Sequence, residues 1–402
     1  MYKTSFRFLW IGQSFANSGD VFYMVGLIAI IYTLTGSVTY MALVPFFITT
    51  SRFFSGVLAP LVIERIPLKQ LLSYSQLGKT LVILLLGCYI EFTPSSSTVF
   101  LIFLFVTIIS FLDGWANPAR NSLIPLFIEK DLLVKANSFL AIIDQTIRLG
   151  GWVAGGILVA FIGSKNIIWL TLILYTISSI MMFSIKNVDN KPVNDKIQNR
   201  TSMGDKLKEG WLNIWNTPSL RTISIVEFLE SIANVVWVAA IMYVYVSEIL
   251  QTNEQWWGYI NASFFAGLMI GGSISLKWSH LINNFASVVI VVGAFGASIT
   301  TFMFSLISTP WISLIIAFLF GMLNQVKDVA QQTSVQKSVN QNFLPKVYSA
   351  KDTIITATFG ISSLILGSLT DLVGVRFVFL LSASILFIMA LYVYFSRKKL
   401  IL

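Results

Sequence analysis

The stretch Thr98-Val-Phe-Leu-Ile-Phe-Leu-Phe-Val-Thr-Ile-Ile-Ser-Phe-Leu-Asp113 contains no charged side chain before its aspartate, and the apolar run continues to Arg120. A helix needs about 20 mostly apolar residues to cross the hydrocarbon core of a bilayer. The sequence therefore predicts a membrane-spanning helix over 98–120, with one carboxylate inside it.

The rest of the chain repeats this pattern. Of its 402 residues, 56% are hydrophobic and 11% are charged, against about 25% charged in a soluble domain, and the mean hydropathy is +0.79. This composition excludes a soluble globular enzyme, a disordered chain and a nucleic-acid-binding protein. The twelve predicted spans are 8–33, 38–62, 71–90, 98–120, 136–161, 166–185, 220–246, 257–278, 285–306, 311–335, 350–371 and 375–395.

A polar stretch separates the spans into two groups of six. We predict an all-α membrane protein of 12 transmembrane helices in two pseudo-symmetric six-helix bundles, residues 1–185 and 219–402, joined by a cytoplasmic linker over 186–218. Within the linker, Leu207, Trp211, Ile214 and Trp215 follow helical spacing and predict a short amphipathic helix in the membrane interface.

An internal repeat supports the duplication. At an offset of 211 residues, Gly156-Ile-Leu-Val-Ala-Phe-Ile-Gly163 aligns with Gly367-Ser-Leu-Thr-Asp-Leu-Val-Gly374, and Ser138 aligns with Ser349. Both segments belong to the fifth span of their half. Duplicated halves are typical of transporters that rock around a site near the membrane midplane.

The distribution of basic residues predicts the orientation. Of the 27 Lys and Arg residues, only Lys165 and Arg376 fall in segments that lie outside if both termini are cytoplasmic. Cytoplasmic loops carry an excess of Lys and Arg, so both termini are predicted inside, in a multi-pass protein of a bacterial cell membrane. Lys3 and Arg7 precede an apolar run without a small-residue cleavage site, which predicts a first spanning helix rather than a cleaved leader.

Motifs for bound groups are missing from the sequence. It holds no G-x-x-x-x-G-K-[ST] run for phosphate, and one Cys and one His, Cys88 and His280, form no metal motif. We therefore expect no metal, no cofactor and no enzymatic reaction. The expected partners are the lipid bilayer, a small amphipathic substrate and protons, with no nucleic acid. No pattern requires a partner protein, so a monomer is expected.

Several motifs together resemble a known family. They are Phe6-Arg-Phe-Leu-Trp-Ile-Gly-Gln13, Ser18-Gly-Asp20, Tyr32-Thr-Leu-Thr-Gly-Ser37, Asn117-Pro-Ala-Arg120 and Lys346-Val-Tyr-Ser349. In this order they resemble the macrolide-efflux branch of the drug:proton antiporters in the major facilitator superfamily. The resemblance implies a secondary active transporter that exports an amphipathic or cationic small molecule, drug-like or macrolide-like, by alternating access coupled to protons.

Two other functions stay open. The same fold serves lysophospholipid and siderophore transport, which the resemblance does not separate from drug efflux. A non-transporting membrane scaffold is disfavoured, because ionisable residues inside spans are costly and usually functional.

One loop departs from the superfamily pattern. Where the loop between the second and third spans usually reads G-x-L-a-D-R-x-G-R-K, this chain has Pro60-Leu-Val-Ile-Glu64-Arg65-Ile-Pro67-Leu-Lys69. Proline replaces both glycines, whereas the acid and the basic residues are kept in kind. The resemblance implies a gating role for Glu64, Arg65 and Lys69.

Intramembrane charges are the main functional candidates. Asp20 and Arg52 both lie near the midplane and are predicted to be able to pair; a paired Asp20 is structural, whereas an unpaired one carries a proton or contacts substrate. Asp144 and Arg148, four residues apart, share a helix face and form the easiest local ion pair. Lys79 is expected to snorkel to the interface.

The second half offers a further pair of acids. Glu227 and Glu230 lie three residues apart, and their repulsion favours a retained proton, with Glu230 the deeper of the two. Lys327 and the adjacent Asp328 point about 100° apart on a helix and are expected to face different neighbours. At the offset of 211, Asp113 corresponds to Asn324.

Three sets of site residues follow. The proton-coupling candidates are Asp20, Glu230, Asp113 and Asp144. The substrate-cavity candidates are Asp113, Asn324, Arg148, Trp237, Phe22 and Tyr23. The structural or gating charges are Arg52, Arg148, Glu64, Arg65, Lys69, Lys327 and Asp328.

Overall fold

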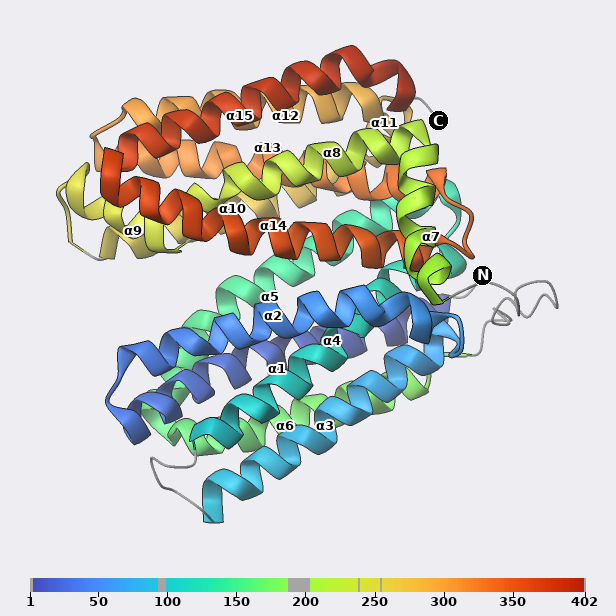
Figure 1. The fold of residues 1–402 in the computed structure, drawn as a ribbon, viewed down its shortest axis with the longest axis vertical. Coiled ribbons are helices and arrows are strands. Elements are labelled where there is room, and N and C mark those ends of the chain that lie inside the picture. Colours follow the sequence, from blue (N-terminus) through green and yellow to red (C-terminus); the bar gives the residue numbers. More distant parts are fainter. Residues whose placement is uncertain (1–2, 93–98, 187–202, 238, 254, 401–402) are drawn as a thin grey trace. The chain divides into compact units, whose positions relative to one another are not determined.

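The structure is a computed structural model that describes residues 3–92, 99–186, 203–237, 239–253 and 255–400. It divides the chain into two compact units, drawn in Figure 1. Unit 1 comprises Met1–Glu129, Thr146–Trp211 and Gln341–Thr353, and unit 2 comprises Lys130–Gln145, Leu212–Asn340 and Ile354–Leu402. The predicted boundaries at 185 and 219 stay a prediction.

Helices account for nearly all of the described residues. In unit 1 they are α1 (Lys3–Thr35), α2 (Val38–Ile63), α3 (Leu68–Phe92), α4 (Val99–Phe127) and α6 (Ser164–Phe183). In unit 2 they are η2 (Lys130–Leu132), α8 (Pro218–Ala233), η4 (Asn234–Trp237), α9 (Ala239–Glu248), α10 (Gln255–Lys277), α11 (Ser279–Asn284), α12 (Ala286–Leu306), α13 (Pro310–Ser338), α15 (Val375–Ser396) and η5 (Arg397–Leu400). Helices α5 (Leu133–Ile162), α7 (Met203–Asn216) and α14 (Leu344–Val373) contribute to both units.

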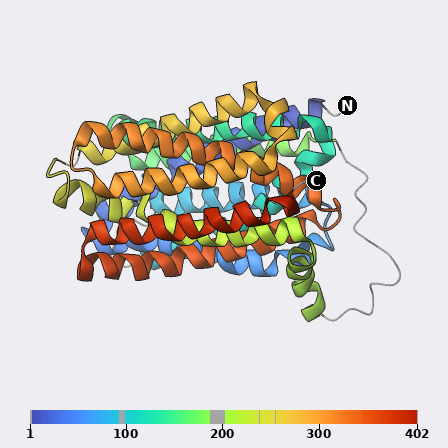
Figure 2. The same cartoon turned by 90° about the horizontal axis from the view of Figure 1, so that it is seen from above.

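The predicted all-α membrane fold is confirmed. Within the described ranges, 11 helices are long and apolar enough to cross a membrane, and Pro218–Trp237 with Ile241–Glu248, bent by 41°, would make the twelfth span. Helices satisfy every backbone polar group internally, which is why apolar runs of this length adopt them in lipid. The long helices of each unit run lengthwise beside one another (Figure 2).

Helix α4 shows how an apolar run places a charge. Its buried residues Ile102, Val106, Ile109 and Asp113 recur every three or four positions, so they form one stripe along the helix. That stripe packs against α2 and α3. The aspartate therefore enters the interior of unit 1 because it lies on the packed stripe.

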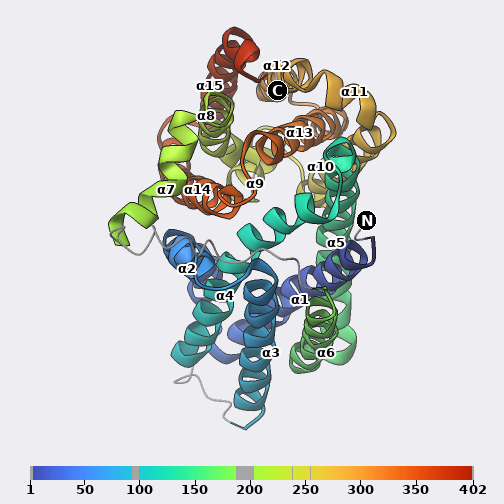
Figure 3. The same cartoon turned by 90° about the vertical axis from the view of Figure 1, so that its right-hand side faces the viewer.

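The two units repeat one packing pattern, as the predicted duplication requires. In unit 1, α1 packs against α6, α2 against α4, and α3 against both α4 and α6. In unit 2, α8 packs against α15, α10 against α13, and α12 against both α13 and α15. Figure 3 shows these two groups of helices end on.

Two glycines confirm the repeat at the residue level. Gly163 precedes α6 with φ 83° and ψ 155°, and Gly374 precedes α15 with φ 87° and ψ 152°. Only glycine adopts such angles without strain. The offset of 211 residues therefore joins two copies of the same tight turn between a fifth and a sixth helix.

The fifth long helix of each half, α5 or α14, forms a hydrogen bond with a helix from the other half of the sequence. In unit 2, Asn137 of α5 donates to Thr333 Oγ1 of α13 at 2.9 Å. In unit 1, Ser349 of α14 donates to the carbonyl oxygen of Gly56 in α2 at 2.6 Å. These bonds explain why each compact unit contains residues from both halves of the sequence.

Glycines set the closest helix approach in unit 2. Gly267 and Gly271 lie one turn apart on α10, and a Cβ on either would overlap the backbone carbonyl oxygens of Phe318 or Met322 in α13. A Cβ on Gly321 of α13 would overlap α10 in return. Small residues permit such packing in membranes, so α10 and α13 form the tightest contact of this unit.

The predicted linker helix is present. Helix α7 spans Met203–Asn216, while residues 187–202 lie outside the described part of the chain. Ile214 is buried, whereas Leu212 and Trp215 are exposed. Exposed aromatic and aliphatic groups on this helix suit the predicted interfacial position, which stays a prediction.

Candidate functional site

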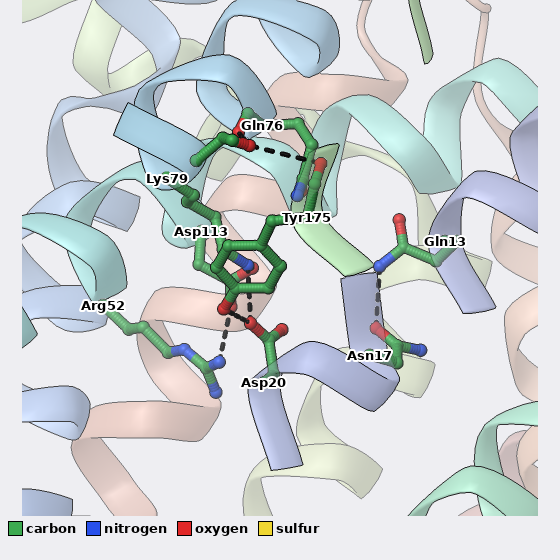
Figure 4. Close-up of polar contacts among 9 residues, drawn as sticks. Gln13, Asn17, Asp20, Arg52, Gln76, Lys79, Asp113 and Tyr175 are labelled. Atoms are coloured by element: carbon green, nitrogen blue, oxygen red, sulfur yellow. Dashed lines mark hydrogen bonds and ion pairs between the residues drawn. The ribbon is translucent and has the colours of Figure 1, made fainter. Parts of the chain in front are cut away.

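Each unit contains a centre of charged side chains built around a buried lysine. We call the first the unit-1 centre; it consists of Asp20 on α1, Arg52 on α2, Lys79 on α3, Asp113 on α4 and Tyr175 on α6 (Figure 4). The Lys79 side chain is only 1% exposed, and its amine contacts Asp20 Oδ1 at 2.7 Å and Asp113 Oδ1 at 3.1 Å. The lysine thus joins two carboxylates from different helices.

The remaining members complete the unit-1 centre. Arg52 forms an ion pair with the second oxygen of Asp113, and the Tyr175 hydroxyl donates to Asp20 Oδ1. The Lys79 amine also lies 4.9 Å from the centre of the Tyr175 ring. Two cations face two carboxylates, so the centre is electrically balanced.

Neighbouring residues hold this centre in place. The Thr80 hydroxyl lies 3.2 Å from the carbonyl oxygen of Tyr175 and 2.9 Å from the Ser179 hydroxyl, which ties α3 to α6. A Cβ on Gly19 would overlap the Tyr175 ring. The absence of a side chain at Gly19 therefore lets the tyrosine reach the carboxylate on α1.

Two sequence predictions about this centre are wrong. Asp20 pairs with Lys79 rather than with Arg52, whose partner is Asp113. Lys79 does not snorkel, because α3 packs against both α4 and α6 and carries its amine inward. A signal was available: Gln76, Lys79 and Thr80 share a helix face, which is unusual for a side turned to lipid.

The unit-2 centre consists of Glu230 on α8 and Asn324, Lys327 and Asp328 on α13. The Lys327 side chain is 0% exposed, and its amine lies 2.7 Å from Glu230 Oε1 and 3.6 Å from Asp328 Oδ1. It donates to Asn324 Oδ1 at 2.6 Å, and the Asn324 amide donates to Asp328 at 3.1 Å. Here one cation faces two carboxylates.

This geometry adds a partner to one predicted site residue and corrects another expectation. Glu230 forms an ion pair with Lys327. The spacing of Glu227 and Glu230 gives no indication of this partner, because Lys327 belongs to another helix. Lys327 and Asp328 do not face entirely different neighbours, since both contact Asn324 and lie 3.6 Å apart. Glu227, one turn before Glu230, adds to the negative potential there.

The two centres share one plan. Each contains a buried lysine that contacts a carboxylate on the first helix of its half. The aligned residues Asp113 and Asn324 have matching roles, because each accepts a hydrogen bond from that lysine. The lysines themselves come from different helices. Lys327 fits on α13 because Gly293 of α12 leaves room for its Cβ.

Of the three aromatic residues predicted to line a substrate cavity, two are buried and one is partly exposed. Trp237 is buried and stacks on Phe320 with the ring centres 4.1 Å apart, so it belongs to the packed core of unit 2. Tyr23 is buried near Asp20, and its hydroxyl has no hydrogen-bond partner among the described residues. Phe22 is partly exposed.

The other intramembrane pair stays a prediction. Asp144 lies in the segment of α5 assigned to unit 2, and Arg148 lies in the segment assigned to unit 1.

A third cluster of charges lies in unit 1, at the loop identified from the sequence. Lys346 at the start of α14 contacts Glu64 at 2.5 Å and also forms an ion pair with Glu209 of α7. Arg65 is exposed and Lys69 is partly buried. The sequence alone indicates no role for Lys346 or Glu209, because their partners lie more than a hundred residues away in the chain.

Replacing Lys346 by glutamine is expected to loosen α7. The change removes the ammonium that joins Glu64 to Glu209, and one charge-assisted hydrogen bond contributes about 1.5–3 kcal/mol. Hydrogen exchange of the α7 amides should therefore accelerate about tenfold. The matched control is Lys208→Gln, which removes an exposed charge from α7 itself. Equal exchange in the wild-type protein and Lys346→Gln would show that the cluster does not hold α7.

Comparison with known proteins identifies the family. The family model of the Major Facilitator Superfamily matches residues 9–353. The chain belongs to this superfamily. It is therefore a transporter of small molecules across the bilayer.

Individual relatives agree with this membership. The superfamily transporter YfmI of Bacillus subtilis (strain 168), itself uncharacterised, is 30% identical over 94% of this chain and 93% of its own. The multidrug efflux pump Tap of Mycolicibacterium fortuitum is 22% identical over 72% of this chain and 70% of its own. A bacterial homologue of the iron transporter ferroportin, solved in an outward-facing state, matches with a TM-score of 0.80 at 12% identity, over 98% of this chain and 99% of its own. That last likeness concerns the fold alone.

Proposed function

We propose that this superfamily member exports an amphipathic or cationic small molecule in exchange for protons, by alternating access, with both termini in the cytoplasm. The distant similarity to the multidrug efflux pump Tap supports export of a drug-like compound. The predicted excess of Lys and Arg in the inner loops supports the orientation.

The proposed coupling to protons rests on two carboxylates that share one buried amine in the unit-2 centre. Glu230 and Asp328 both contact the amine of Lys327, and the side chains of Glu230, Asp328 and Lys327 are 9%, 42% and 0% exposed. A carboxylate as buried as that of Glu230 is costly unless positive charge lies beside it. A proton or a cationic substrate can add positive charge there. Because both satisfy the same carboxylates, binding of one favours release of the other.

The unit-1 centre has a different part in this proposal. Its two cations and two carboxylates are already balanced, so it needs no added proton. We therefore assign Asp113, Asp20 and Arg52 to holding the helices of unit 1 together and the coupling to Glu230 and Asp328. Tyr23, with its unpartnered hydroxyl, offers a polar contact to substrate near Asp20.

The test uses liposomes that contain the purified protein and an internal pH-sensitive dye. A pH gradient is imposed, and lipophilic cations, macrolides and lysolipids are added in turn. Proton flux triggered by one compound is expected in the wild-type protein and should fall to the level of empty liposomes in Glu230→Gln and Asp328→Asn. The matched control is Glu248→Gln, which changes an exposed carboxylate at the end of α9 and should leave the flux intact.

Other outcomes would overturn parts of the proposal. Flux that survives in both variants and disappears in Asp20→Asn would move the coupling to the unit-1 centre. Lysolipid transfer between leaflets without proton movement would replace drug export by lipid transport.

A further inference from the structure

A polar cavity lies at one end of unit 2, and its lining includes no member of the unit-2 centre. Its volume is about 120 Å³. It is bordered by α11, the first residues of α12, the last turns of α13 and Leu400 of η5. The lining residues are Val134, Ile282, Asn283, Asn284, Ala286, Ser287, Ala330, Thr333, Ser334, Lys337 and Leu400.

The beginning of α12 supplies backbone donors to this cavity. The first intrahelical bonds of α12 run from Val288 and Val289 to the carbonyl oxygen of Phe285. The amides of Ala286 and Ser287 precede these bonds, and both residues line the cavity. The partial positive charge at the N-terminus of this 21-residue helix favours an anion there.

A lysine adds a full positive charge. Lys337, in the last turn of α13, donates to the side-chain carbonyl oxygen of Asn283. An ammonium group has three donors, so this bond positions the amine and leaves further donors for a ligand. Because Asn283 accepts through its oxygen, its amide nitrogen also remains available as a donor.

A buried hydroxyl is a second, independent sign of a ligand. Ser334 lines the cavity and is 1% exposed, yet its hydroxyl has no hydrogen-bond partner among the described residues. A buried polar group without a partner is destabilising unless a bound species satisfies it. The neighbouring Thr333 differs, since its hydroxyl accepts a bond from Asn137.

Charges of both signs surround Lys337. Asp131 of η2 acts on it more strongly than Lys130 does, while Lys337 itself lies on the cavity wall. Arg397, Lys398 and Lys399 precede the lining residue Leu400 in η5 and add positive charge at this end of unit 2.

We infer that this cavity binds a phosphate group. Helix amides, an ammonium, a side-chain amide and a hydroxyl together match the several acceptor oxygens of a phosphate. The volume admits such a group, since one water occupies about 30 Å³ of liquid. The phosphate belongs either to the headgroup of an anionic lipid or to a soluble phosphate compound. Exposed apolar residues beside the cavity, Leu281, Phe285 and Val288, suit a headgroup whose chains lie along the protein.

The test titrates the purified protein in neutral detergent with inorganic phosphate, at ionic strength held constant with KCl. In parallel, nanodiscs of phosphatidylcholine are compared with nanodiscs that contain phosphatidylglycerol, and lipid retained per protein is counted by native mass spectrometry. Lys337→Gln removes the charge but keeps a polar group. Because one charge-assisted hydrogen bond is lost, the affinity should fall about tenfold. Lys208→Gln, a charge removed from exposed α7 in unit 1, is the matched control and should bind as the wild-type protein does.

Ser287→Asp is a second variant, and it tests binding without removing a side chain that stabilises the fold. A carboxylate in the first turn of α12 is favourable to the helix, so thermal stability should be kept or raised, while the new negative charge repels phosphate. Saturable binding of inorganic phosphate that both variants weaken would support a soluble ligand, and retention of one phosphatidylglycerol that both variants weaken would support a headgroup. Binding that is absent, or equal in the wild-type protein and both variants, would overturn the inference.

Discussion

Lys79→Met is expected to destabilise the protein by about 3 kcal/mol, the lower end of what breaking a buried ion pair costs, because Asp20 loses its cation while its side chain is 26% exposed. The amine it deletes contacts both Asp20 and Asp113. Arg52 remains as the counter-ion of Asp113, but Asp20 keeps only the Tyr175 hydroxyl among its described contacts of the unit-1 centre. The expected result is a lower yield of folded protein and a lower midpoint of thermal unfolding in detergent.

A second substitution should restore much of this loss. In Lys79→Met with Asp20→Asn, one positive and one negative charge are removed together, and the Arg52–Asp113 pair is kept. The matched control, Lys208→Met, makes the same change at an exposed position and should have little effect on stability. If Lys79→Met unfolded at the wild-type temperature, the lysine would not be the organising charge of unit 1. If the double variant were no more stable than Lys79→Met, the loss would come from packing rather than from charge.

Gly267→Ala is the second change with a large expected effect. The added methyl group would overlap the carbonyl oxygen of Phe318, which belongs to the backbone of α13 and cannot rotate away. Overpacking typically lowers the free energy of unfolding by about 1–3 kcal/mol. Because this clash is with backbone atoms, we expect a loss of about 3 kcal/mol. The α10–α13 contact should open, which would be seen as a lower unfolding midpoint and faster hydrogen exchange at the facing turns of both helices.

Gly258→Ala is a closely matched control, because it makes the same change on the same helix at a position with no neighbour within 4 Å. Alanine also has the higher helix propensity, so this variant should be as stable as the wild-type protein or slightly more stable. Equal melting of the two variants would mean that the glycine contact does not limit the approach of α10 to α13.

The predictable part of this protein is the part determined by local composition. The run from Thr98 to Asp113 has one stable state in a bilayer, a helix, since no other local structure satisfies its backbone in lipid. The same reasoning predicts the linker helix α7 and the other spans, of which the seventh is broken in the structure into Pro218–Trp237 and Ile241–Glu248. The repeat at an offset of 211 residues was detectable because glycine alone fits the turns at Gly163 and Gly374.

The partners of the intramembrane charges, unlike the helices, could not be predicted from the sequence. Asp20, Asp113, Glu230 and Lys327 were recognised as intramembrane charges because a charge in an apolar run is visible in the sequence. The pairs they form were not recognised. Lys79 is 59 residues from Asp20 and 34 from Asp113, and Lys346 is 282 residues from Glu64.

Sequence by itself thus determined where the helices run, how they repeat and which of them carry charge, because each of these depends on neighbours within a few turns and on the solvent. Tertiary structure decided which charges meet. The meeting of two side chains from separate helices depends on the rotation and depth at which those helices pack, and these are set by contacts such as Gly19 with Tyr175 and Gly293 with Lys327. Those contacts exist only once the helices are assembled, which is why the lysine at the middle of each centre is recognised in the fold and not in the sequence.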